Sequence, residues 1–177
     1  MLASPGDLPR TSDRSWAYEV KWDGMRLLGT LSRGRLRLTS RNGNDATTRF
    51  LEVAEAAPEG LPEGSVLDGE VVAFDPEGRP SFALLAPRIQ RAQPPGPHHA
   101  RLTFLVFDLL RLGDVDVTGR SYDERRALLA EHVVPTARVL VPDSFDEGEA
   151  LLASTEQRGL EGVVAKRRAS TYQQGVR

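Results

Sequence analysis

The sequence predicts an α+β fold in which mostly antiparallel sheets are flanked by helices. Short segments rich in β-branched and aromatic residues follow one another across glycine-containing turns, which is typical of antiparallel hairpins. Segments with helical spacing interrupt these strands singly, without the regular strand–helix alternation of a parallel sheet. The chain has 177 residues, of which 40% are apolar, so it can bury one core; we expect one main domain over 1–177.

The N-terminal half is expected to form paired strands and one helix. Asp23-Gly24 and Arg33-Gly34 predict hairpin turns between alternating segments. The turn Asn42–Asp45 would cap the helix that follows it. The predicted elements, in chain order, are an extended lead-in over 1–15, strands over 16–22, 26–32 and 35–40, a helix over 47–56 and a strand over 66–74.

The C-terminal half is expected to contain three helices and three strands. Ser121-Tyr122-Asp123-Glu124 has the form of a capping box, which predicts the start of a helix. The predicted elements, in chain order, are a helix over 81–90, a proline-rich loop over 93–100 with an exposed His98-His99 pair, a strand over 102–111, a helix over 121–132, a strand over 139–141, a helix over 145–158 and a strand over 162–167.

Composition narrows the classes of function. The chain has no cysteine, which excludes disulfides and thiolate metal sites and fits a cytosolic protein. No apolar run approaches the roughly 20 residues that cross a bilayer, and the N-terminus lacks the pattern of a signal peptide. The formal net charge of −2 gives no overall basic excess. Contact with DNA would therefore depend on a local patch or on help from elsewhere.

The two lysines stand out among the basic residues. Of the 23 basic residues, all except Lys21 and Lys166 are arginine. Arginine cannot lose its proton to become a nucleophile, whereas lysine can. The pattern singles out these two positions for chemistry, although codon bias would give the same count.

The segment Glu19–Arg26, which reads Glu-Val-Lys-Trp-Asp-Gly-Met-Arg, could form a phosphate site. If its apolar residues face the core, Lys21 points the other way, beside Glu19 and Asp23. A lysine before a glycine turn, with Arg26 in reach, suits phosphate oxygens. The alternative is a solvated strand face of mixed charge.

Five stretches follow one another along the chain: Lys21–Arg26, Ser40–Gly43, Leu67–Val72, Phe104–Leu110 and Glu161–Lys166. In this order they resemble the motifs of the covalent nucleotidyltransferases, which comprise DNA ligases, RNA ligases and mRNA capping enzymes. The forms Leu-Asp-Gly-Glu and aromatic-Asp-Leu-Leu resemble ATP-dependent DNA ligases more than capping enzymes. The lead-in Met1–Gly6, followed by Trp16–Lys21, is most similar to bacterial ligases of the repair and end-joining type. The resemblance implies the ATP-grasp-like nucleotidyltransferase fold of a DNA ligase adenylation domain.

The resemblance implies that Lys21 attacks the α-phosphorus of ATP and then carries AMP as a phosphoramidate. Phe107 would stack on adenine, and Glu19 would read the exocyclic amine of the base. The remaining ATP-binding residues would be Arg26 and Arg41 on the ribose and phosphates, Glu70 on the ribose, and Lys166 on the phosphates.

The same resemblance implies that Glu161 and Glu70 bind Mg²⁺ or Mn²⁺, since carboxylate oxygens suit such cations. Taken singly, these residues have simpler explanations. Phe107 would more often belong to the core, Glu70 would be solvated, Glu161 would follow a helix end, and Arg41 would be a turn residue.

The implied partner is nicked or broken double-stranded DNA, whose 5′-phosphate would receive the AMP. DNA-repair proteins are further candidate partners, and the implied location is the bacterial cytoplasm, near the nucleoid and away from membranes. The family pattern continues with paired lysines of a last core motif and a C-terminal OB-fold domain, which this sequence lacks. The chain is therefore expected to be a truncated adenylation domain whose nick sealing by itself is very weak or absent.

Two alternatives remain open from the sequence. One is an RNA ligase or a capping-type nucleotidyltransferase, which nucleotide preference would separate from a DNA ligase. The other is a non-catalytic module that holds a nucleotide or a repair partner without turnover.

Overall fold

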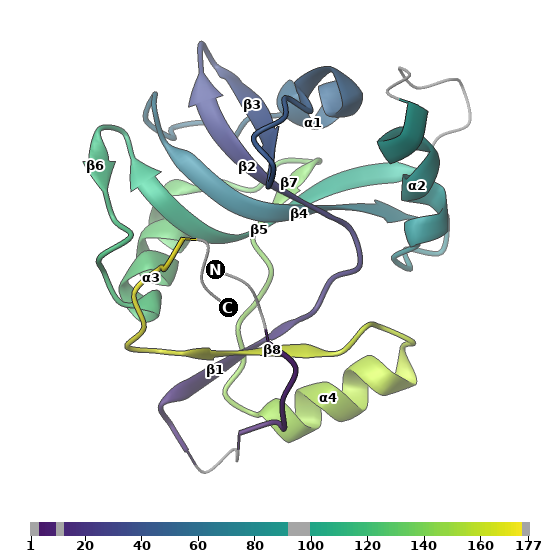
Figure 1. Cartoon of the computed structure of the whole chain (residues 1–177), viewed down its shortest axis with the longest axis vertical. Helices are drawn as coiled ribbons and strands as arrows, with labels where there is room; N and C mark the ends of the chain where they lie inside the picture. Colours follow the sequence, from purple (N-terminus) through teal and green to yellow (C-terminus); the bar gives the residue numbers. More distant parts are fainter. Residues whose placement is uncertain (1–3, 10–12, 92–99, 175–177) are drawn as a thin grey trace.

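A computed structural model describes residues 4–9, 13–91 and 100–174, which form two antiparallel sheets (Figure 1). The larger sheet has the order β3-β2-β4-β5-β6, and β7 pairs with β5 in parallel. The smaller sheet pairs β1 with β8. The prediction of an α+β fold is confirmed. The strands are β1 (Trp16–Val20), β2 (Met25–Ser32), β3 (Arg35–Ser40), β4 (Val66–Phe74), β5 (Arg101–Leu112), β6 (Val115–Asp116), β7 (Val139–Leu140) and β8 (Val163–Arg167).

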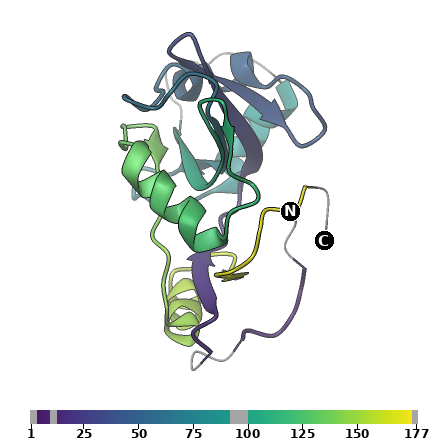
Figure 2. The same cartoon turned by 90° about the vertical axis from the view of Figure 1, so that its left-hand side faces the viewer.

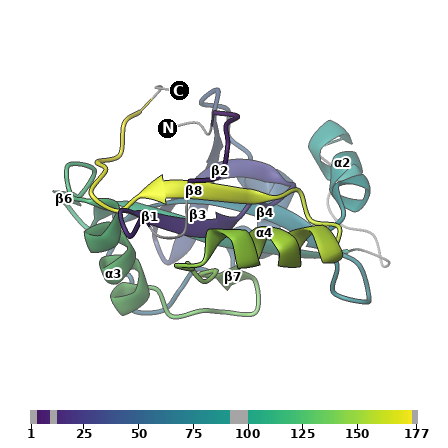
Figure 3. The ribbon, with the colours of Figure 1, turned by 90° about the horizontal axis from the view of Figure 1, so that it is seen from below.

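The helices flank these sheets. A 3₁₀ turn over Thr47–Phe50 leads into α1 (Leu51–Ala54), while α2 (Phe82–Arg91) packs against β4 and α3 (Tyr122–His132) against β5. In the views from the side and from below, α4 (Gly148–Gln157) lies along the smaller sheet, at one end of the molecule (Figures 2 and 3). None of the described helices is long and apolar enough to cross a membrane.

The core lies on the larger sheet and beneath its helices. Alternating residues of β2, β3 and β4 point into it, as the period-2 pattern of the sequence predicts. Burying such apolar side chains contributes roughly 1.5–3 kcal/mol each. The buried residues include Leu27, Leu38, Phe50, Leu67, Val71, Leu85, Phe104, Leu109 and Leu129.

The hairpin expected at Asp23-Gly24 is wrong, because β1 pairs with β8 whereas β2 joins the larger sheet. Gly24 has another structural role: a Cβ there would lie 2.4 Å from the carbonyl oxygen of Val71 on β4. Glycine allows the chain to pass β4 closely as it crosses between the sheets. The turn at Arg33-Gly34 is confirmed, with φ of 54° and 71°, as a two-residue type I′ turn requires.

Helix boundaries differ from the prediction where tertiary pairing overrides local pattern. The capping box of α3 is confirmed, since Ser121 and Glu124 exchange side-chain and backbone hydrogen bonds. Helix α4 begins at Gly148 and not at Phe145, because the backbone of Phe145 exchanges two hydrogen bonds with Tyr18 on β1. The expected loop 93–100 and its His98-His99 pair lie outside the described residues, except for Ala100.

Candidate active site

The predicted site residues come from both sheets, which meet near the end of β1. Strand β1 and the residue after it carry Glu19 and Lys21, while β8 and the loop before it carry Lys166 and Glu161. The larger sheet contributes the others: Arg26 from β2, Glu70 from β4, Phe107 from β5 and, just beyond β3, Arg41.

Lys21 lies at the open part of this site. Its backbone N–H donates to the carbonyl of Gly162 at 2.8 Å, so the pairing of β1 with β8 continues one residue past the strand. Its ammonium forms an ion pair with Glu161, and the two side chains are 41% and 40% exposed. An exposed ion pair contributes little to stability and opens easily. The Lys21 amine is therefore accessible to a substrate.

Glu19 is buried and held by three groups. Tyr122 donates a hydrogen bond from its hydroxyl to Oε1 at 2.6 Å, and Lys166 Nζ lies 2.6 Å from Oε2. Arg126 Nη1 is 3.9 Å from Oε1. These partners offset the cost of burying the carboxylate. Burial, together with the Glu19 charge, raises the pKa of Tyr122 above its usual range, so Tyr122 stays a hydrogen-bond donor.

Phe107 is half-buried and faces two cations, apart from the core cluster. Lys166 Nζ lies 4.6 Å from the centre of the ring, and Arg26 Cζ lies 5.4 Å from it. A cation over an aromatic face is attracted to the negative face of the ring. The structure thus places Lys166 beside Glu19 and Phe107, the two residues expected at the base, and not beside Lys21.

Arg26 is oriented by Asp68, a residue that the sequence analysis did not single out. The guanidinium donates from Nε at 3.0 Å and from Nη2 at 2.6 Å to the two carboxylate oxygens. Asp68 is fully buried, and the Tyr172 hydroxyl also donates to its Oδ2 at 2.7 Å. A two-bond arginine–carboxylate pair fixes the plane of the guanidinium.

Glu70 lies opposite Arg26 in the pairing of β2 with β4. Burial raises the pKa of its carboxyl to about 7, against the opposing effects of Arg26 and Lys21. Asp68 and Asp23 raise it further. The simple expectation of a solvated Glu70 does not hold, and this carboxyl titrates near neutral pH.

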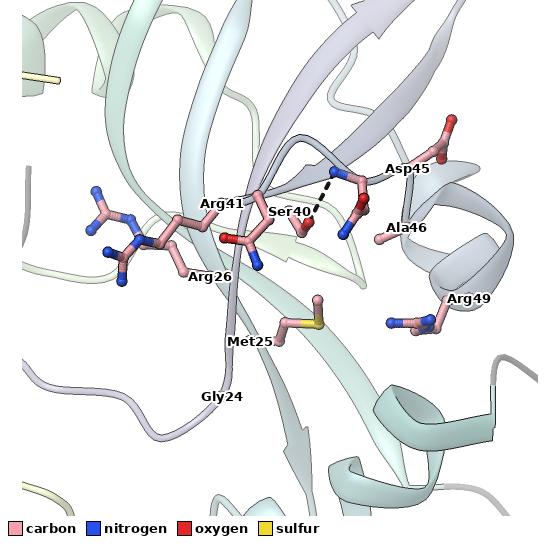
Figure 4. A pocket seen from close by; sticks show the side chains of 10 residues that line it. Gly24, Met25, Arg26, Ser40, Arg41, Asp45, Ala46 and Arg49 are labelled. Atoms are coloured by element: carbon pink, nitrogen blue, oxygen red, sulfur yellow. Dashed lines mark hydrogen bonds between the residues drawn. The ribbon is translucent and has the colours of Figure 1, made fainter. Parts of the chain in front are cut away.

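Arg41 lines a cavity of about 590 Å³ together with Arg26 and Arg49. In Figure 4 the side chains of Arg26 and Arg41 extend to the same side, and that of Arg49 lies on the other. Three arginines against one carboxylate, Asp45, favour an anionic ligand. The full lining is Gly24, Met25, Arg26, Ser40, Arg41, Asn42, Asn44, Asp45, Ala46 and Arg49.

A protein-only metal cage is absent from the described residues, where no group of three or more His, Cys, Asp or Glu could hold an ion. Two carboxylates nevertheless interact with Lys21: Glu161 forms an ion pair with it, and the Lys21 charge opposes the rise in the pKa of Glu70. Mg²⁺ is often bound in this way, by one or two carboxylates together with waters and substrate phosphates. The donor set therefore fits a cation that arrives with a phosphate ligand.

Comparison with known proteins decides the family. A sequence model described as ATP dependent DNA ligase domain matches residues 1–177. The chain belongs to this family. It is 37% identical over 178 residues to the multifunctional non-homologous end joining DNA repair protein LigD of Mycobacterium tuberculosis, covering 100% of this chain and 22% of LigD. DNA ligase C of the same organism is 36% identical over 168 residues, covering 89% of this chain and 47% of that protein.

Solved ligase structures share the fold. A mycobacterial DNA ligase D complexed with ATP and MES superposes with a TM-score of 0.74 at 38% identity, covering 90% of this chain and 50% of that chain. The Chlorella virus DNA ligase-adenylate has a TM-score of 0.62 at 19% identity, covering 97% and 61%, and supports the fold alone. The expected nucleotidyltransferase fold is confirmed. The chain spans about a fifth of LigD and about half of ligase C.

Within this ligase domain, sequence reasoning missed four residues that border the site. Asp68 lies inside the stretch Leu67–Val72, so the family resemblance of that stretch could have indicated Asp68 as a site residue. Tyr122 was noted only as part of a capping box, and nothing in the sequence singled out Arg49 or Tyr172. The contacts of both tyrosines span more than a hundred residues, beyond any local pattern.

Proposed function

We propose that this ligase domain transfers AMP from ATP to its own Lys21. The observation that carries the proposal is the accessible Lys21 amine, which pairs with Glu161 and whose charge acts on the Glu70 carboxyl. Glu70 in turn lies opposite Arg26, which lines the arginine-rich cavity. The domain thus combines a nucleophile, oxygen ligands for a cation and a positive surface for phosphates. Phosphoryl transfer depends mainly on such positioning and charge.

In the proposed reaction, the lone pair of Lys21 Nζ forms a bond to the α-phosphorus of ATP. The bond from that phosphorus to the oxygen shared with the β-phosphate breaks, and pyrophosphate leaves with the electron pair. Lys21 must first be neutral, and its ammonium gives up a proton to Glu161 or to water. A divalent cation at Glu161 and Glu70 would supply charge neutralisation for the phosphates.

The base end of the nucleotide would lie at Phe107 and Glu19. The half-buried Phe107 ring offers a stacking surface, and the Glu19 carboxylate can accept from an exocyclic amine. Arg26 and Arg41 would bind ribose and phosphate oxygens. For Lys166 to reach a phosphate it would have to leave Glu19, so its proposed phosphate contact requires a rearrangement of that ion pair.

The proposed acceptor of the AMP is the 5′-phosphate of nicked or broken double-stranded DNA. The cavity that contains Arg41 and Arg49 supports this proposal, because its positive charge favours a phosphate. This local positive charge would attract DNA even though the chain as a whole has a net charge of −2. The names of LigD and its relatives refer to end joining and DNA repair. By analogy we propose repair proteins as partners and a cytoplasmic, nucleoid-associated location.

The test is intact mass spectrometry after incubation with ATP and Mg²⁺. The wild type should gain one AMP, and it should gain none with EDTA in place of Mg²⁺. Lys21→Arg keeps the charge but should form no adduct, whereas the matched variant Lys166→Arg should still form it, more slowly. An equal adduct in the Lys21→Arg variant would refute the proposal.

Incubation with GTP separates this function from that of a capping-type enzyme, and nicked DNA and RNA compared as acceptors separate a DNA ligase from an RNA ligase.

A further inference from the structure

Tyr172 lies five residues beyond β8 and contacts Arg26 and Asp68 at the proposed nucleotide site. The proposed function gives Tyr172 no role. Its hydroxyl donates to Oδ2 of Asp68 at 2.7 Å and accepts from Nη2 of Arg26 at 3.2 Å. The three side chains therefore form a closed triangle of hydrogen bonds. Arg26 is the member that also lines the arginine-rich cavity and contacts Phe107.

We infer that Tyr172 is a positioning residue for adenylation: its hydroxyl fixes the Asp68 carboxylate, and through it the Arg26 guanidinium, at the nucleotide site. This inference rests on the proposed function. It concerns the orientation of Arg26, since Tyr172 itself need not touch the nucleotide.

The burial of Asp68 makes the hydroxyl important. The Asp68 side chain is fully buried, so water cannot replace a lost donor, whereas the Arg26 side chain is 29% exposed. Of the two Asp68 oxygens, Oδ1 accepts from Arg26 Nε and Oδ2 accepts from both Arg26 Nη2 and Tyr172. Without the Tyr172 hydroxyl, the hydrogen bonds described above leave Arg26 alone to hold the Asp68 carboxylate. The pair could then turn together toward solvent.

Tyr172 is suited to this role because its own position is fixed. Its backbone N–H donates to the carbonyl of Thr118 at 2.8 Å. Its ring lies 5.8 Å from Cζ of Arg125, which is fully buried and donates two bonds to Asp108. Arg125 also donates to the carbonyl of Ser170 at 3.0 Å, which holds the segment just before Tyr172.

The two aspartate–arginine pairs are adjacent. Asp68 and Asp108 face each other in the pairing of β4 with β5, so the Tyr172 side chain packs between a buried pair and a partly exposed one. The buried pair, Asp108 with Arg125, provides a rigid support. The partly exposed pair, Asp68 with Arg26, borders the cavity through Arg26 and is the pair whose geometry needs fixing.

The chain offers a matched control in Tyr18. Tyr18 is buried, whereas Tyr172 is partly buried, and the Tyr18 hydroxyl likewise donates a hydrogen bond, to the carbonyl of Pro9 at 3.0 Å. Among the described residues, that hydroxyl forms no hydrogen bond with a site residue. Tyr18→Phe thus removes a comparable hydrogen bond without disturbing Arg26.

The experiment compares Tyr172→Phe with Tyr18→Phe in the whole chain, by single-turnover formation of Lys–AMP followed by mass spectrometry. Tyr172→Phe should slow adenylation by about tenfold, because small displacements of positioning groups are costly. Tyr18→Phe should stay within about twofold of the wild type, as expected for a hydrogen bond remote from the reacting atoms. In an Arg26→Lys background, which cannot form the two-bond pair, Tyr172→Phe should have little further effect. A full tenfold effect in that background, or none in the wild-type background, would overturn the inference.

A second readout does not depend on activity. The Nε–H proton of Arg26, assigned in ¹⁵N NMR spectra by its loss in Arg26→Lys, should exchange with water at least about tenfold faster in Tyr172→Phe. Unchanged exchange would contradict the positioning role. If the wild type forms no Lys–AMP while this exchange still accelerates, the proposed function fails but the control of Arg26 by Tyr172 stands. If the adduct forms and both readouts are unchanged, only the inference fails.

Discussion

The only two lysines of the chain belong to the same small sheet, Lys166 on β8 and Lys21 just after β1, but lie in opposite environments. The Lys21 side chain is 41% exposed and pairs with an equally exposed Glu161. The Lys166 side chain is 11% exposed, pairs with the buried Glu19 and lies over the rings of Phe107 and Tyr122. Lys21 can leave its partner at little cost, whereas separating Lys166 from Glu19 is costly because both side chains are buried.

This difference shows how one residue type serves two purposes. A nucleophile must be accessible and must be able to lose its proton, which an exposed, loosely paired amine allows. A buried ammonium close to a carboxylate and over two aromatic rings is held in place and organises its neighbours. Accessibility, not residue type, therefore distinguishes Lys21 from Lys166.

The largest expected effect concerns the buried pair. Glu19→Gln leaves Lys166 and Arg126 without their carboxylate and should lower the free energy of unfolding by about 3 kcal/mol. Glu161→Gln, which breaks the exposed pair, should change it by no more than about 1 kcal/mol. Urea unfolding at constant pH measures both. Equal losses would remove the distinction between the two lysines.

The next effect concerns rate. Glu161→Gln should slow formation of Lys–AMP about 100-fold, since it removes a proposed cation ligand beside the nucleophile. Because its stability is nearly unchanged, the variant separates chemistry from folding. The loss should be smaller at high Mn²⁺ concentration if it reflects weaker metal binding. A rate within about threefold of the wild type would exclude Glu161 from the reaction.

A third effect is a pH dependence of stability from Glu70. The pKa of this carboxyl is about 7 in the folded chain, above its ordinary value of 4.5, so the folded state binds a proton in this interval that the unfolded state does not. Its contribution is complete below about pH 4.5 and is lost as the pH rises through 7. Relative to Glu70→Gln, the wild type should lose about 2 kcal/mol between pH 4.5 and 7.5. Parallel stability curves of the two proteins, from urea unfolding, would contradict this.

The smallest predicted effect concerns nucleotide choice. Tyr122→Phe removes the hydroxyl that holds Glu19 and should reduce the preference for ATP over GTP by about fivefold, worth roughly 1 kcal/mol. Competition between the two nucleotides in the adenylation assay measures it. Tyr18→Phe is again the control, and an equal shift in both variants would show a general effect of the lost hydroxyl.

The local sequence pattern predicted most of the secondary structure, because the spacing of apolar residues reflects which side chains are buried. Strand β4 was predicted with its observed bounds, since its β-branched residues lie between clear turns. The hairpin at Asp23-Gly24 failed because an Asp-Gly pair signals a tight turn and a close backbone approach equally well. The pattern could not reveal that β1 belongs with β8, more than a hundred residues away.

For the site, the family resemblance pointed to residues that the fold brings together, but not to how they are paired. The ion pair between Lys21 and Glu161 joins two of the recognised stretches. The contacts of Tyr122 with Glu19 and of Tyr172 with Asp68 depend on tertiary packing, because each hydroxyl meets a carboxylate on a distant strand. The positions of those supporting tyrosines could therefore come only from the structure.

The most direct test of the difference between the two lysines is to locate the AMP. After incubation with ATP and Mg²⁺, proteolysis at neutral pH and tandem mass spectrometry identify the modified peptide. The structure predicts AMP on the peptide that contains Lys21, with the Lys166 peptide unmodified. AMP on Lys166, or on a residue other than lysine, would contradict the assignment of the nucleophile by accessibility.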